Sequence, residues 1–309
     1  MASSCSRPIS LPVFGFLAFA AVSLHAQDTL PKYRAALEQL GGSEEYRAAV
    51  IRAADLYASN DYRATIVEAR QAARLNASDW TARALVAMSY YQLGEAVDIR
   101  APGGAALRER LCDSIVEAAE EGIRAAPERG ECSFLRGLAR ARKATTAGVM
   151  YAIFRARSIE NDWLRAEQCH SDFVTPQNED LTAACYVALG IFYRLVPSSR
   201  VVKLLIGTRG DIDRSIDYLT RAVARAPDRI EYRKELGVSL VTKGIRTSNA
   251  GLVEQGREQL RLVPTLPIML PVTDTIVIRH ARMLLDSVEL CPGYSRDQQQ
   301  ELDEAKLRK

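Results

Sequence analysis

The sequence has few of the side chains that usually bind metals or act as nucleophiles. Its 309 residues include 3 histidines and 6 cysteines, and no histidines are spaced as a His-x-x-x-His or His-Glu-x-x-His pair. A Gly-x-Ser-x-Gly nucleophile motif and a glycine-rich phosphate loop with its lysine are also absent. These absences predict a non-catalytic chain without a cofactor or metal. An enzyme of unknown type is the least favoured alternative.

Charge of one sign is not concentrated anywhere in the sequence. The 41 basic and 38 acidic residues give a formal net charge of +3, and they are interleaved along the chain. Nucleic-acid-binding proteins usually carry a block of lysine and arginine, so we do not expect a nucleic-acid partner. Apolar residues make up 48% of the chain and charged residues 26%, which is ordinary for a folded protein.

Long apolar runs are missing after the first 26 residues. The nearest candidate, residues 262–278, is interrupted by three prolines and Asp274. A membrane-spanning helix needs about 18 or more largely uninterrupted apolar residues. We therefore expect no transmembrane segment in the mature chain.

The N-terminus has the three parts of a secretory signal peptide. Residues 1–8 carry Arg7, residues 9–24 are apolar, and the sequence turns polar after the small residue Ala26. We predict a signal peptide over residues 1–26 and a helical domain over residues 27–309. An uncleaved membrane anchor is the alternative, but Pro12 and Gly15 interrupt a run that is already short for a span. Export predicts a periplasmic or cell-envelope location in a bacterium, with an extracellular location as the alternative.

Two of the five cysteines that follow the signal segment flank a turn-like stretch. Cys169 and Cys185 stand on either side of residues 175–178, Thr-Pro-Gln-Asn. Antiparallel helices around this turn could bring the two thiols together. Three interpretations stay open: a disulfide, which an oxidising compartment permits; burial of both thiols as small apolar groups; and, with His170, a zinc site that lacks a fourth ligand at a recognised spacing.

Apolar residues recur with the period of an α-helix. Between residues 211 and 226 they stand three or four positions apart, which predicts an amphipathic helix. Asp211 is placed to cap the start of this helix and Pro227 to end it. We expect Asp228 to cap the next helix and Gly244 to end it. The same pattern predicts helices over residues 61–75, 80–93, 110–126, 131–143 and 146–171, the last with a break near Asn161.

Small and large residues alternate in the pattern of a helical hairpin between residues 186 and 244. The positions are Tyr186, Leu189, Gly190, Tyr193, Ser215, Leu219, Ala222, Pro227 and Gly237. Small residues let two helices approach, and large residues fill the space between them. This pattern is the signature of a tetratricopeptide-repeat (TPR) hairpin, and it predicts an all-α, TPR-like superhelix.

Residues 182–285 resemble divergent TPR proteins of the regulator-of-microtubule-dynamics type. They also resemble the bacterial periplasmic TPR protein that accompanies some tripartite substrate-uptake transporters. In this pattern the first helix of the hairpin carries Leu-Gly and an aromatic residue, here Leu189, Gly190 and Tyr193, and an extra segment precedes the second helix. The resemblance implies the fold and a binding scaffold. It does not imply a particular ligand.

Two functions fit this sequence. The first is an exported, non-catalytic scaffold that binds a protein or peptide in its concave groove. The second is a ligand-binding accessory component of a tripartite uptake system, which would hold an apolar small molecule between residues 195–207 and 264–278.

Two segments, residues 95–107 and 195–209, are predicted as insertions between the helices. Two features near them could belong to either function. Arginines there could hold a carboxylate or form a solvated surface; they are Arg155, Arg157, Arg194 and Arg200. A short apolar helix expected near residues 201–206 could cover the groove, contact a membrane or a partner, or fold back onto its own hairpin.

Overall fold

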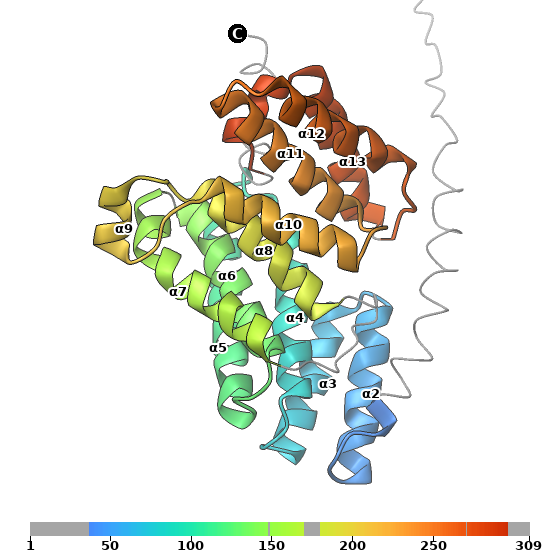
Figure 1. The fold of residues 1–309 in the computed structure, drawn as a ribbon. Helices are drawn as coiled ribbons and strands as arrows, with labels where there is room; N and C mark the ends of the chain where they lie inside the picture. Colours follow the sequence, from blue (N-terminus) through green and yellow to red (C-terminus); the bar gives the residue numbers. More distant parts are fainter. Residues whose placement is uncertain (1–36, 148, 170–179, 270, 296–309) are drawn as a thin grey trace, which may run out of the picture.

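The structure is a computed structural model that describes residues 37–147, 149–169, 180–269 and 271–295. All regular secondary structure in these ranges is helical, and consecutive helices pack against one another in a stacked array (Figure 1). The prediction of an all-α, TPR-like superhelix is therefore confirmed. The predicted signal peptide, residues 1–26, lies outside the described residues.

The helices follow one another with mostly short connections. They are α2 (Glu44–Ala58), α3 (Tyr62–Leu75), α4 (Thr81–Glu95), α5 (Gly104–Ala125), α6 (Glu131–Ala147), α7 (Val149–Gln168), α8 (Leu181–Leu195), α9 (Arg200–Ile206), α10 (Ile212–Arg225), α11 (Ile230–Arg246), α12 (Ala250–Leu262) and α13 (Pro271–Asp286). Two 3-10 turns follow the last long helices: η1 (Val263–Thr265) after α12 and η2 (Val288–Gly293) after α13.

The longer helices form two rows. In one row, successive helices contact one another in addition to their neighbours in the chain. This row consists of α2, α4, α6, α8, α11 and α13. We call these the inner helices, and we call α3, α5, α7, α10 and α12 the outer helices. Stacked hairpins curve toward the row whose members touch, so the inner helices line the concave side of the array.

Side-chain caps fix the starts of several helices. The carboxylate of Asp61 accepts from the backbone N–H of Ala64 at 3.0 Å, at the start of α3. Asp211 accepts from the N–H groups of Asp213 and Arg214 at 3.0 and 3.1 Å, as its position before α10 predicts. These bonds satisfy backbone donors that have no partner inside a helix, and so they define where the chain begins to coil.

Three predictions about helix ends are wrong. α7 runs unbroken through Asn161. α11 begins after Arg229 with no side-chain cap, so Asp228 does not cap it. Gly244 lies inside α11, where a Cβ atom would come within 2.7 Å of the backbone nitrogen of Val253. This glycine therefore permits the close approach of α12 instead of ending α11.

The small residues of the predicted hairpin lie at helix contacts. A Cβ atom at Gly190 would lie 2.5 Å from Cγ of Leu219, so its absence lets α8 approach α10. Ala222, one turn further along α10, is fully buried. Ser215 bonds Ser239 of α11 through their hydroxyls at 3.0 Å.

Gly237 also lies at a close helix contact, as its small size predicts. A Cβ atom there would lie 2.9 Å from the carbonyl oxygen of Gly256 and 2.9 Å from Cγ of Leu260. Gly237 therefore brings α11 close to α12, and the α10–α11 contact is made by other residues.

Candidate binding site on the inner face

The last described residues fold back across three inner helices. η2 contacts α11 and α13, and Arg194 near the end of α8 reaches the same segment. Since α8, α11 and α13 are successive inner helices, residues 288–295 lie on the concave side of the array. We call residues 288–295 the C-terminal strap. It occupies the face on which a TPR-like array would hold a peptide.

Tyr294 anchors the strap. Its side chain is fully buried, and its hydroxyl accepts from Nζ of Lys234 at 3.0 Å. The same hydroxyl lies 2.9 Å from Nδ1 of His280 on α13. The carbonyl oxygen of Tyr294 accepts from Nη1 of Arg194 at 3.1 Å. Three inner helices thus recognise both the side chain and the backbone of a single residue.

Buried ion pairs hold the recognising side chains in place. Glu235 lies between two cations: Arg194 binds one carboxylate oxygen, and Nζ of Lys234 lies 2.6 Å from the other. Lys234 is fully buried, and Glu235 and Arg194 are 2% and 5% exposed. Removing charges from water is unfavourable unless they are paired and hydrogen-bonded, so this arrangement depends on all of its members.

The protonated forms of Lys234 and Tyr294 are both favoured. Burial alone would lower the pKa of Lys234, but the adjacent Glu235, and then Tyr294, outweigh it and raise the pKa. Burial raises the pKa of Tyr294, and the neighbouring lysine offsets only part of that effect. At neutral pH the site therefore consists of a charged lysine that donates to a neutral phenol.

This geometry suits recognition better than catalysis. Both oxygens of Glu235 are engaged by cations, so it is poorly placed to take a proton from a substrate. Nε of Arg194 is buried and has no hydrogen-bond partner. The site therefore keeps one spare donor beside the backbone of the strap.

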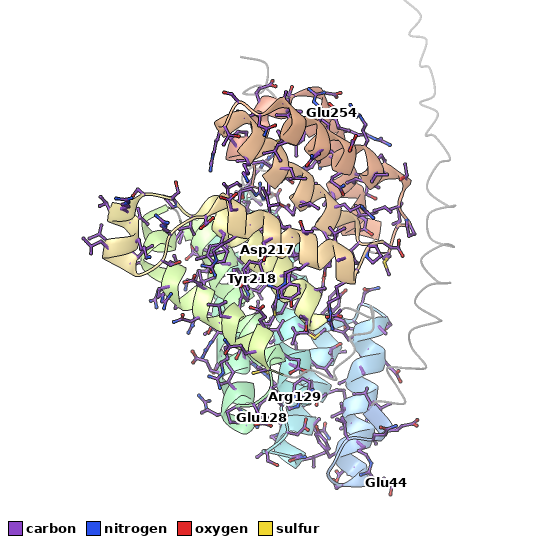
Figure 2. The ribbon with its side chains drawn as sticks, viewed as in Figure 1. Glu44, Glu128, Arg129, Asp217, Tyr218 and Glu254 are labelled. Atoms are coloured by element: carbon purple, nitrogen blue, oxygen red, sulfur yellow. The ribbon has the colours of Figure 1, made fainter. Side chains whose placement is uncertain are left out.

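The predicted repeat positions on α8 and α10 lie elsewhere, in the buried contact between these two helices. The ring of Tyr193 stacks on that of Tyr218 with centroids 5.8 Å apart, on the side of α10 that meets α8 (Figure 2). Cζ of Arg214 lies 3.9 Å from the ring centroid of Tyr193, and Cζ of Arg221 lies 4.0 Å from that of Tyr186. These contacts join α8 and α10, so the hairpin's pattern of small and large residues accounts for packing and not for ligand binding.

Glutamates on α7 complete this contact. The hydroxyl of Tyr193 donates to Glu160 at 2.6 Å, and Nη2 of Arg221 lies 3.2 Å from Glu167. The repeat tyrosines therefore bind three helices together.

The arginines that the sequence singled out have separate roles. Arg194 does hold a carboxylate, that of Glu235 in its own chain. Arg157 pairs with Glu160 at 2.8 Å on the same helix. Arg200 is exposed on α9.

The described cysteines are all free thiols. Cys169 is partly exposed and Cys185 is buried in α8, and they are not bonded to each other. The disulfide between them is therefore not formed in this structure. Burial raises the pKa of Cys185, so its thiol is protonated at neutral pH. The turn expected at residues 175–178 and His170 lie outside the described residues.

Neither a metal cluster nor a membrane-spanning helix is found in the part of the chain that the structure describes. No group of three or more His, Cys, Asp or Glu residues there could hold a metal ion. None of its helices is long and apolar enough to cross a bilayer.

Most of the candidate site was not predicted from the sequence. Arg194 was singled out, but Lys234, Glu235, His280 and Tyr294 were not. The available signal was the composition of α11, which is apolar on more than one side and yet contains adjacent Lys and Glu. A helix that is buried all round must pair any charge it carries, so this dipeptide marks an internal ion pair.

Comparison with known proteins gives similarity only at the level of structure. No family description and no curated protein matches the sequence. MamA (41-end) from Desulfovibrio magneticus RS-1 has a TM-score of 0.43 at 12% identity, over 73% of this chain and 97% of that one. PilF of Pseudomonas aeruginosa has a TM-score of 0.43 at 14% identity, over 83% and 96%. Cut9, in the APC/C Cut9–Hcn1 hetero-tetramer, has a TM-score of 0.38 at 13% identity, over 86% and 48%.

Proposed function

We propose that this protein is an exported, non-catalytic scaffold that binds a peptide segment of a partner protein on its inner face. The observation that carries the proposal is the C-terminal strap. In this structure the face already holds a peptide segment, with Tyr294 as its anchor and its backbone bound by Arg194. A surface that recognises a tyrosine and the adjoining main chain is suited to a partner segment of the same chemistry.

A peptide groove is favoured over a small-molecule site. Large apolar side chains in the two segments proposed to line an apolar ligand face solvent: Leu204 is 87% exposed, and Ile268 is 52% exposed. A cavity of about 390 Å³ between α3, α4 and α5 is lined by three arginines and two glutamates and lies away from those segments. Its polar lining does not suit an apolar compound.

A peptide-exchange experiment tests the proposed groove. Tyr294→Ala removes the anchor of the strap, and a fluorescent peptide with the sequence of residues 288–295 is then added. We expect saturable binding to the variant by fluorescence anisotropy. Binding to the unaltered protein should be weaker, because its own strap competes at a high effective concentration.

The matched control is the same peptide with alanine in place of tyrosine. The proposal requires that this peptide binds the variant more weakly. Equal binding of the two peptides, or binding of neither, would contradict a tyrosine-anchored groove.

Export is tested separately by the mass of the mature protein. Expression in a bacterium followed by mass spectrometry of the cell-envelope fraction should give a chain that begins at Gln27. A chain that keeps residues 1–26 would contradict cleavage, whatever the peptide assay shows.

A further inference from the structure

An insert between α8 and α10 exposes a compact apolar surface. The exposed fractions are 65% for Val201, 87% for Leu204 and 75% for Leu205. These residues stand at i, i+3 and i+4 on α9 and so share one face of the helix. A soluble protein rarely leaves such a group together in water without a binding role.

The exposure belongs to a well-defined helix. The hydroxyl of Ser199 accepts from the N–H of Val202 at 3.1 Å, which caps the start of α9. Gly207, with a left-handed φ of 76°, closes the other end and donates to the carbonyl of Lys203. Both caps hold the helix in one conformation, so the apolar face is a fixed surface.

The opposite face of α9 is attached to the body of the protein. Ile206 packs against the apolar cluster formed by α6, α7, α8 and α10, and Gly207 lies against the side chain of Arg157 on α7. The two ends of the insert are also tied together, since the N–H of Gly210 donates to the carbonyl of Pro197 at 3.0 Å. α9 cannot rotate without breaking these contacts. Its exposed side chains therefore cannot turn toward the interior of the protein.

The charges within the insert itself are all positive. Residues 195–210 contain Arg200, Lys203 and Arg209 and no aspartate or glutamate. Arg200 and Lys203 are both exposed to solvent. Phe154, one turn before Arg157 on α7, adds a further apolar side chain that is 73% exposed.

We propose that α9, with Phe154, docks this protein on an anionic lipid bilayer. The helix lies at the edge of the molecule and projects from the array (Figure 1). A projecting apolar tip suits the soft interfacial region of a bilayer, into which it can insert from above, whereas a protein partner would need a matching cleft. The surrounding cations match lipid phosphates, and their long side chains can reach the headgroups while the apolar face is buried.

Vesicle co-sedimentation tests the docking surface on the full chain. The probes are vesicles of phosphatidylglycerol mixed with phosphatidylcholine, and vesicles of phosphatidylcholine alone. We expect binding to the anionic vesicles that weakens as salt is raised, and much less binding to the neutral ones. Equal binding to both compositions, or binding to neither, overturns the proposal.

Two variants locate the binding on α9. Leu204→Asp together with Leu205→Asp should reduce the bound fraction about tenfold or more, because each charge opposes insertion into the interface. Val67→Asp is the matched control, since Val67 is 67% exposed on α3 and should leave binding unchanged. An equal loss in both variants, or none in the α9 variant, contradicts the assignment.

A protein occupant is a distinct outcome. The unaltered chain could self-associate in gel filtration and fail to bind vesicles. If the Leu204→Asp, Leu205→Asp variant is then monomeric, the surface is a dimer interface and the lipid proposal is wrong. The peptide-exchange assay does not involve α9, so it can succeed or fail independently.

Discussion

The two halves of the array have different interiors. From α2 to α6 the buried apolar side chains form one continuous cluster, rich in alanine. From the end of α6 onward the apolar interior divides into three smaller clusters. Among the described residues, the second half also contains the larger set of buried charged or titratable side chains: Glu160, Asp162, Arg194, Lys234, Glu235, Asp274 and His280.

The two halves are thus stabilised by different interactions, apolar packing in the first and buried ion pairs in the second. Apolar packing tolerates small shifts between helices, because dispersion contacts have no direction. Buried ion pairs are directional, and each is unfavourable if one partner is lost. The first half is therefore held by close packing, whereas the second half needs specific partners in place, including a segment from the end of the chain.

Removal of Glu235 should give the largest effect. Glu235→Ala leaves Arg194 and Lys234 buried without their carboxylate, and we expect a loss of about 3–5 kcal/mol in the free energy of unfolding. Urea denaturation measures it. The control is Glu254→Ala, because Glu254 pairs with Arg261 at 2.6 Å on the surface and is 53% exposed. An exposed pair contributes about 1 kcal/mol at most, so similar losses in the two variants would contradict the contrast between the halves.

A substitution at Gly190 should have an intermediate effect. Gly190→Leu places a side chain where even a Cβ atom would lie 2.5 Å from Leu219, and we expect overpacking to remove about 1–3 kcal/mol of stability. Thermal melting measures this. Gly41→Leu is the control, because no atom lies within 4 Å of a Cβ at Gly41. An unchanged midpoint for the Gly190 variant would show that α8 and α10 do not pack in this arrangement.

Alkaline pH should lower the stability of the second half gradually, and by less than the two substitutions above. The pKa of Lys234 is raised above its ordinary 10.5, and that of Tyr294 above its ordinary 10.0. Both groups are thus more stable protonated when the protein is folded. Their contribution is complete below pH 10 and is lost as the pH rises through the raised pKa values.

Denaturation at several pH values from 8 upward, on the intact protein and on Tyr294→Phe, measures this effect. The phenylalanine variant cannot ionise at position 294, so its stability should fall less steeply with pH. Parallel curves for the two proteins would show that Tyr294 does not contribute to the pH dependence.

Much of the fold could be predicted from the sequence because its signals are local. The apolar period of α10, its cap at Asp211 and the glycines at tight contacts depend on residues within a few turns of one another. The end of α11 was misjudged for the same reason. Gly244 has the composition of a helix end, but its role is set by α12, which no local pattern represents.

The candidate site was harder to predict because its members lie far apart in the chain. Arg194, Glu235, His280 and Tyr294 come from four elements, and each is an unremarkable residue in its own segment. Only the packing of α8, α11, α13 and the strap on one another brings them together. The apolar insert at α9 was identified, but the sequence could not show which of its residues pack on α7 and which face water.

The bond between Arg194 and Tyr294 joins residues 100 positions apart. A repeat array otherwise unfolds one unit at a time from its end, because each unit contacts only its neighbours. The strap links the last unit of the array directly to α8. Fraying from this end should therefore be suppressed, and amide hydrogens from α8 to α13 should exchange together as one cooperative block.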